Sequence, residues 1–263
     1  MSKWRPLPAD CLYVIPDVHG MYAQLRLICN RIFPLRKTNG VKDKLVFLGD
    51  YIDRRLGSPA VVDFLIEAKK KYKDQLVLLA GNHELMILDA MDPMKPAARH
   101  NMWLLNGGEE TLMAYLERAG ESKESAKNFP RFRIKDLIPR EHLNFYHNLE
   151  KYHETDNYIF VHGGLDPTFD VSKHSIEELV WDRSLFEYVQ RHVRTPIPDA
   201  YPLDWKKTII VGHSGATGKP LITDKFMMLD ISCANKLLVV ELNSMQAFYA
   251  QVGKKRLVEY KLV

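Results

Sequence analysis

The chain has 263 residues, of which 46% are hydrophobic and 27% are charged, and its formal net charge is +4. This composition is typical of a globular protein with its own core, and so small a positive charge gives little reason to expect nucleic-acid binding. The sequence has no apolar run long enough for a membrane span, no secretory signal pattern and no cysteine spacing typical of a disulfide framework. We therefore expect a cytoplasmic monomer that binds neither membranes nor nucleic acid.

Short apolar runs alternate with helical patterns over the first two thirds of the chain. Five apolar runs predict buried strands, at Leu12–Pro16, Leu45–Leu48, Leu76–Ala80, Tyr158–Val161 and Thr208–Val211. Helical periodicity or a capping signal predicts helices through Leu25–Ile32, from the N-cap Ser58 and first-turn Pro59 onward, and over His83–Met91 and Glu109–Arg118. The alternation predicts βαβ units and a largely parallel sheet.

The last part of the chain has a different pattern. Four further runs predict strands in direct succession, at Phe226–Asp230, Leu237–Leu242, Gln246–Gln251 and Arg256–Leu262. Sequential strands joined by short turns favour antiparallel pairing. We predict an α/β fold with two mixed β-sheets packed as a sandwich flanked by helices, in one domain over residues 1–263 with insertions near 92–135 and 187–206.

Side chains with the chemistry of metal ligands follow the first two predicted strands. In Asp17-Val18-His19-Gly20, the extended backbone points Asp17 and His19 the same way, so that both can bind one ion. Gly49-Asp50-Tyr51-Ile52-Asp53-Arg54 brings two carboxylates and a guanidinium to the next strand end. Each motif taken alone fits a polar turn or a surface ion pair equally well.

The three later strand ends offer an amide and imidazoles. Asn82 provides a neutral oxygen ligand, His83 is suited to proton transfer near neutral pH, and Glu84 suits the first turn of the following helix. His162-Gly163-Gly164 and Gly212-His213 follow the last two strands. Either histidine in isolation is adequately explained as an ordinary loop residue.

The combination of the five motifs is more specific than any one of them. Carboxylate, amide and imidazole groups without thiolate suit manganese, iron or zinc. Six candidate ligands exceed the needs of one tetrahedral site and favour two ions that share a ligand: Asp17, His19, Asp50, Asn82, His162 and His213.

The motifs DVHG, GDYIDR, GNHE, HGGLDP and GHS, in this order from Asp17, resemble those of the calcineurin-like metallophosphoesterase superfamily. They are most similar to its phosphoprotein phosphatase family, in the compact form of bacteria and phages. The resemblance implies the metallophosphoesterase fold and hydrolysis of a phosphorylated protein or small phosphoester. It also implies two divalent metal ions, manganese in the first place and iron or zinc as alternatives.

The resemblance further implies a role for each matching residue. Asp17 and His19 would bind one metal ion, and Asn82, His162 and His213 would bind the second. Asp50 would bind both ions. The general acid would be His83, oriented by Asp53, and Arg54 would hold phosphate oxygens.

Family members use a second arginine, and Arg183 in Trp181-Asp182-Arg183 stands in about the right place. A helix-surface arginine paired with Asp182 or Glu187 is the alternative interpretation. The chain has Arg55 where the family usually has glycine, which implies an altered loop and an added cation near the mouth of the site.

The sequence leaves two substrates open. One is a protein carrying phosphoserine or phosphothreonine, with phosphotyrosine as a further option. The other is diadenosine tetraphosphate, the substrate of a symmetrical bis(5'-nucleosyl)-tetraphosphatase. The motif GDYIDR, with Asp53 present, looks more like that of the protein phosphatases. A non-catalytic phosphate-binding protein would have lost ligands, and all are present. The segments Trp103–Gly108 and Arg191–Lys206 are expected either to line the substrate mouth or to form a structural cap.

Overall fold

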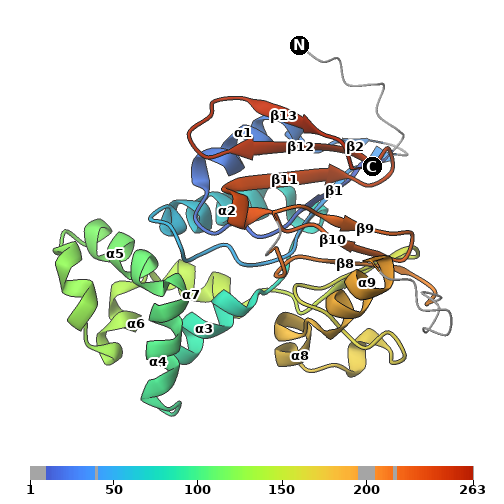
Figure 1. Cartoon of the computed structure of the whole chain (residues 1–263). Helices are drawn as coiled ribbons and strands as arrows, with labels where there is room; N and C mark the ends of the chain where they lie inside the picture. The colour runs from blue at the N-terminus through green and yellow to red at the C-terminus, as the bar shows by residue number, and fades with distance from the viewer. Residues whose placement is uncertain (1–9, 39–40, 195–204, 216–217, 263) are drawn as a thin grey trace.

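The computed structural model describes residues 10–38, 41–194, 205–215 and 218–262, and these contain two mixed β-sheets with helices outside them (Figure 1). The first sheet has the order β13–β12–β11–β1–β4–β5 and the second β6–β7–β8–β10–β9. The strands of the first sheet are β1 (Leu12–Ile15), β4 (Lys44–Phe47), β5 (Leu76–Leu78), β11 (Lys236–Glu241), β12 (Gln246–Gln251) and β13 (Leu257–Tyr260). Those of the second are β6 (His153–Glu154), β7 (Tyr158–Phe160), β8 (Thr208–Val211), β9 (Leu221–Ile222) and β10 (Phe226–Met228). A separate hairpin joins β2 (Lys37–Thr38) to β3 (Val41–Lys42).

The strand pairing agrees with the predicted directions at all but one place. β1, β4 and β5 are parallel, and β11, β12 and β13 form antiparallel pairs. The antiparallel prediction is wrong for β10, which lies in the second sheet and pairs in parallel with β8. The short strand β9 lies antiparallel to β10, so the chain reverses twice after β8 and regains its direction. Two residues are too few to show the alternation that would have predicted β9.

Helices cover the outer face of each sheet. The hydrophobic cluster on the outer side of the first sheet takes buried side chains from α1 (Tyr22–Ile32), α2 (Ser58–Tyr72), α3 (Asn82–Met91), α4 (Ala97–Trp103), α5 (Glu109–Arg118), α6 (Ile134–Leu137) and α7 (Arg140–His147). A π-helical turn, Leu104–Gly108, joins α4 to α5, and 3-10 turns occupy Lys73–Gln75, Lys123–Asn128, Arg131–Arg133, Val171–Lys173 and Ser232–Ala234. Helices α8 (Ile176–Trp181) and α9 (Ser184–Arg194) pack on the second sheet.

The hydrophobic core has three layers because strand side chains alternate in direction. Val14 of β1 and Ile210 of β8 lie in the layer between the sheets, whereas Ile15 packs under the helices of the first sheet and Val211 under those of the second. The molecule is therefore a helix–sheet–sheet–helix sandwich. None of the helices in the described ranges is long and apolar enough to cross a bilayer.

Helices α4 to α7 form a lobe on one side of the molecule (Figure 1). Most of this lobe falls within the insertion predicted near 92–135. Residues 195–204 of the insertion predicted near 187–206, and of the segment Arg191–Lys206, lie outside the described residues. Helix α2 begins at Ser58 itself, with Gly57 rather than Ser58 in the N-cap position.

Candidate metal centre

The five sequence motifs meet where strands of both sheets end. Asp17 and Asp50 follow the parallel strands β1 and β4, and Asn82 and His83 open α3 after β5. His162 and His213 follow β7 and β8, which are also parallel to one another. The carboxyl ends of parallel strands share one edge of a sheet, so two sheet edges bring all these side chains to one place.

Asp50 lies at the middle of the group. Its Oδ2 is 3.6 Å from Nε2 of His19 and 3.3 Å from Nε2 of His162. Its Oδ1 accepts a hydrogen bond from the backbone N–H of His83 at 3.0 Å, which fixes the carboxylate. Asp50 belongs to two sets of three residues that could hold a metal ion, and in each set the possible ligand atoms lie within 4.8 Å of one another. The sets are His19, Asp50 and His83, and Asp50, His162 and His213.

The other two candidate ligands border the same group. Asp17 Oδ2 lies 3.7 Å from His19 Nε2, and its Oδ1 accepts from the backbone N–H of His213 at 2.9 Å. Asn82 Oδ1 is 3.0 Å from His162 Nε2. The structure therefore brings together all six residues that the sequence singled out.

Unpartnered buried atoms show that these residues fit metal ions. His19 Nε2, Asp50 Oδ2 and His213 Nε2 are buried and have no hydrogen-bond partner within the described residues. Burial of such polar atoms is costly unless something binds them. The Nδ1 atoms of His19 and His162 donate to the carbonyls of Ile52 and Leu48, so the Nε2 atom of each ring faces the centre.

His83 differs from the other histidines because both of its nitrogens have partners. Nδ1 lies 2.7 Å from Asp53 Oδ2, and Nε2 lies 3.3 Å from Nη2 of Arg54. The ring nevertheless faces the centre, with Nε2 3.8 Å from Asp50 Oδ2. It is placed to exchange a proton with a group bound there.

Burial and neighbouring charges shift the pKa values of the residues in the centre. Burial, and then the His83 charge, hold the pKa of His19 well below its usual value. Burial and then His162 lower the pKa of His213 to about 2. Burial, followed by the charges of Asp230 and Asp50, raises the pKa of Asp17. A cation would offset the repulsion between the buried carboxylates, as in other metal sites.

Backbone geometry around the centre is unusual. Positive φ angles occur at several site residues, namely His19, Asp50, Asp53, Arg54 and His213. Such conformations are costly for non-glycine residues and cluster at functional sites. Two glycines allow close approach: a Cβ on Gly81 would lie 2.1 Å from Asp50 Oδ1, and one on Gly212 would lie 2.3 Å from Asp17 Oδ1.

Glu84 reaches further than its predicted role in the first turn of α3. The fully buried carboxylate accepts from the N–H groups of Asp50 at 2.9 Å, Tyr51 at 2.8 Å and Gly81 at 3.0 Å. It thereby fastens the loop after β4 to the loop after β5. The pKa of Glu84 is raised to about 7 by burial and the charge of Asp50.

Sequence reasoning missed two residues that support the site. Trp103 is buried and its indole N–H donates to the carboxylate of Asp53. Asp230 accepts from the N–H of Gly215 at 3.0 Å, just after His213. Trp103 belongs to a segment expected at the substrate mouth or in a cap, but no local pattern connects it to a carboxylate 50 residues away.

The arginines occupy different surroundings. Arg54 is exposed and points Nη2 at His83. Arg55 does not stand free at the mouth, because it donates to the carbonyl of His19 at 3.2 Å and to Asn235 Oδ1 at 2.6 Å. Arg183 is exposed just before α9. Burial and the charge of His162 are the larger causes of the lowered pKa of His213, and the charge of Arg183 is a smaller one.

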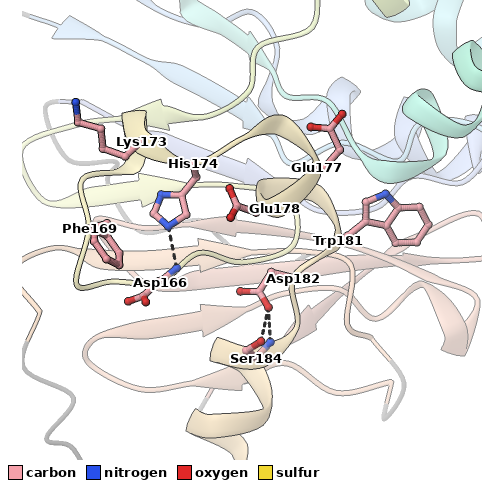
Figure 2. Close-up of a pocket in the computed structure, with 9 residues that line it drawn as sticks. All are labelled: Asp166, Phe169, Lys173, His174, Glu177, Glu178, Trp181, Asp182 and Ser184. Carbon is pink, nitrogen blue, oxygen red and sulfur yellow. Dashed lines mark hydrogen bonds between the residues drawn. The ribbon is translucent and has the colours of Figure 1, made fainter.

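Residues between positions 166 and 184 line a cavity of about 860 Å³, and none of the six candidate ligands is among them (Figure 2). Trp181 on its wall lies edge-on to His213, with ring centroids 6.0 Å apart. The wall carries more carboxylates than cations: Asp166, Glu177, Glu178 and Asp182 against Lys173. The carboxylate of Asp182 accepts from Ser184 at 2.7 Å, as drawn in Figure 2.

Known proteins with similar sequences include enzymes of two kinds. The symmetrical bis(5'-nucleosyl)-tetraphosphatase of Nitrosospira multiformis is 22% identical over a 301-residue alignment that covers 92% of this chain and 96% of that protein. A candidate serine/threonine-protein phosphatase of Caenorhabditis elegans is 41% identical over 71 residues, which are 27% of this chain and only 18% of that protein.

Solved structures share the fold. A protein serine/threonine phosphatase from Saccharomyces cerevisiae matches with a TM-score of 0.54 and 17% identity, covering 96% of this chain and 79% of that one. A cold-active protein-tyrosine phosphatase from Shewanella matches with a TM-score of 0.53 and 15% identity, covering 97% and 83%. These likenesses concern the fold alone, and they confirm the predicted α/β architecture of two mixed sheets with flanking helices.

The family assignment depends on a match along most of the chain. The calcineurin-like phosphoesterase family matches residues 12–238, a range that contains all five motifs. The chain therefore belongs to the calcineurin-like phosphoesterase family and is a hydrolase of phosphoester bonds.

Proposed function

We propose that the protein is a serine/threonine protein phosphatase with a dinuclear centre of divalent ions, manganese in the first place. The observation that carries this proposal is the buried pair of Asp53 and His83, joined at 2.7 Å and set beside unpartnered ligand atoms. Such a pair supplies a proton to an alkoxide leaving group, which serine and threonine esters require.

The contacts support the ligand roles that the resemblance implies. Asp17 and His19 would hold one ion, Asp50 would be shared, and the second ion would be held by Asn82, His162 and His213. When bound, two divalent ions supply a water of lowered pKa and neutralise charge on phosphate oxygens. All six side chains offer oxygen or nitrogen without thiolate, which suits manganese.

His83 would donate its Nε2 proton to the leaving oxygen. Burial alone would lower the pKa of His83, but the charge of Asp50 and the hydrogen bond to Asp53 outweigh it and raise the pKa. The shift favours the protonated ring, in which Nε2 carries a proton and no longer accepts a hydrogen bond from Arg54. Asp53 fixes the ring orientation through Nδ1, as the carboxylate does in other carboxylate–histidine pairs.

Arginines would bind the phosphate. Arg54 is anchored through its backbone N–H to the carbonyl of Gly107 at 2.9 Å, and its guanidinium already lies beside His83. Arg183 would approach from the His213 side of the centre. Two guanidinium groups can each form paired charge-assisted bonds to phosphate oxygens and stabilise the charge of the transition state.

The cavity lined by Trp181, whose ring packs edge-on to His213, supports a protein substrate. Its wall is rich in carboxylates, which would repel a polyphosphate chain and would tolerate a neutral or basic peptide segment. The cavity also holds Trp181 and Phe169, whose rings are suited to packing against side chains.

The second candidate is a symmetrical bis(5'-nucleosyl)-tetraphosphatase. It is favoured by the alignment with the Nitrosospira multiformis enzyme over almost the full length of both chains. Trp181 and Phe169 would then stack on a nucleobase.

A parallel assay with added Mn²⁺ distinguishes the candidates. It would compare a phosphoserine peptide, a phosphotyrosine peptide and diadenosine tetraphosphate at equal concentrations. The proposal predicts the highest kcat/KM on the phosphoserine peptide. A higher value on the dinucleotide would assign the second function, and a higher value on phosphotyrosine would overturn the serine/threonine preference.

A further inference from the structure

We propose that Trp103 is a positioning residue for catalysis, and that its indole N–H holds the Asp53 carboxylate in the orientation that aligns His83. The inference rests on the proposed role of His83 as the general acid. It gives a specific role to part of the segment Trp103–Gly108, which the sequence left as either a substrate mouth or a structural cap.

The three side chains form a buried chain of hydrogen bonds. Trp103 Nε1 lies 3.2 Å from Oδ1 and 3.1 Å from Oδ2 of Asp53, and the same Oδ2 lies 2.7 Å from His83 Nδ1. The relative exposures of Trp103, Asp53 and His83 are 0%, 0% and 1%. Because bulk water does not reach the carboxylate, it cannot replace the indole N–H as a donor.

The Asp53 carboxylate has few other constraints. In the described part of the chain, its oxygens accept hydrogen bonds from Trp103 and His83 alone. Its backbone N–H is held separately by Ser58 Oγ at 3.0 Å and Thr111 Oγ1 at 2.9 Å. The backbone would therefore stay in place without the indole, while the carboxylate could rotate away from His83.

The turn that follows Trp103 holds the indole and also reaches Arg54. A Cβ on Gly108 would lie 2.4 Å from Cε2 of Trp103, so the ring packs directly on the glycine backbone. The carbonyl of Gly107, at φ +99°, accepts the backbone N–H of Arg54. One segment thus fixes the proposed acid through Trp103 and the proposed phosphate ligand through Gly107.

A purely structural role makes a different prediction. Buried tryptophans usually find a hydrogen-bond partner, and loss of that bond should lower stability and reduce turnover equally on all esters. Loss of acid alignment should instead affect esters with poor leaving groups, since a good leaving group departs without a proton.

The test compares Trp103→Phe with wild type on phenyl phosphate and p-nitrophenyl phosphate, both in the manganese-loaded enzyme. Supporting outer residues of a site typically contribute about 10–100-fold, so we expect kcat on phenyl phosphate to fall at least about tenfold. The fall on p-nitrophenyl phosphate should be several times smaller, and KM should change little for either ester. Equal losses on the two esters would overturn the proposal.

Tyr115→Phe is the matched control. It removes another buried donor in the same hydrophobic core cluster as Trp103, one that bonds His142 and Tyr146 rather than Asp53. Its two kcat values should keep the wild-type ratio, and a change like that of Trp103→Phe would also overturn the proposal. If the phenylalanine variant does not fold, benzothienylalanine at position 103 keeps the bicyclic ring and removes only the N–H.

A readout independent of activity separates this inference from the proposed function. In the zinc-loaded protein, the proton on His83 Nδ1 should give a downfield NMR resonance that is absent in His83→Gln. This resonance should shift or broaden in Trp103→Phe and stay in place in Tyr115→Phe. An unchanged resonance in Trp103→Phe would overturn the role of Trp103, whereas wild-type protein inactive on both esters would overturn the proposed function alone.

Discussion

Hydrogen-bond partners divide the residues around the centre into two kinds. His19, Asp50 and His213 each turn a buried atom to the centre that no group in the described residues satisfies. His83 instead has a partner on each nitrogen. The sequence set His83 apart as suited to proton transfer and named the other three residues as candidate ligands, but it could not show which nitrogen or oxygen atoms have hydrogen-bond partners.

Replacement of the proposed acid should depend on the leaving group. His83→Ala should lower kcat on phenyl phosphate by about 10²–10⁴-fold, the usual contribution of general acid catalysis. The loss on p-nitrophenyl phosphate should be much smaller because nitrophenolate leaves without protonation. Steady-state kinetics on the two esters would check this, and matching losses would remove His83 from the acid role.

Glu84 should matter for the architecture of the centre although it binds no ion. Glu84→Gln puts an amide NH₂ where the carboxylate accepts from the N–H groups of Asp50, Tyr51 and Gly81. Because the pKa of Glu84 is raised to about 7, the carboxylate is ionised mainly above that pH. Hydrogen bonds to a charged group contribute about 1.5–3 kcal/mol each, so above about pH 7 we expect a loss of at least about 2 kcal/mol in unfolding free energy. Urea unfolding measures this, with Glu67→Gln on the surface of α2 as the control; a variant as stable as wild type would contradict it.

The elements were largely predictable because short apolar runs coincide with strands. β8 and β12 match their predicted bounds, and the other long strands agree to within two residues at either end. Directions were predictable where strands follow one another through helices or tight turns. They were not predictable for β10, because the two-residue β9 carries no periodic signal, and the Trp103 contact depends on a helical segment folding back across the chain.

One ion pair stabilises the ends of strands remote from the centre. Asp43, just before β4, accepts from the N–H of Cys11 at 3.1 Å and from the Arg36 guanidinium at 2.8 and 2.9 Å. Burial alone would raise the pKa of Asp43, but the Arg36 hydrogen bonds outweigh it and lower the pKa. The folded protein therefore favours the ionised carboxylate more than the unfolded chain does.

The sign of the pH effect follows from this lowered pKa. The stability gained from Asp43 should be present above the ordinary carboxyl pKa of about 3.9 and should be lost as pH falls through the lower value. Asp43→Asn should thus cost about 2 kcal/mol at neutral pH and progressively less in acid. Chemical denaturation as a function of pH checks this, and a cost that grows in acid would contradict the assignment.

Across the whole molecule, the centre joins the two sheets. Its residues come from the ends of β1, β4 and β5 in one sheet and of β7 and β8 in the other. Ions bound only by the folded state stabilise it by mass action, by about 2.7 kcal/mol per site at a free concentration of 100 Kd. Chelation should lower Tm by several degrees and added Mn²⁺ should restore it; a Tm unaffected by chelator would contradict metal binding between the sheets.

The central claim is a dinuclear centre built around Asp50, and elemental analysis of the manganese-loaded protein after gel filtration tests it most directly. Asp50 belongs to both sets of possible metal ligands. Wild type and the surface control Asp63→Asn should therefore each retain two ions per chain. Asp50→Asn, folded as judged by circular dichroism, should retain one ion or none. Two ions retained by Asp50→Asn, or none by wild type, would contradict the account.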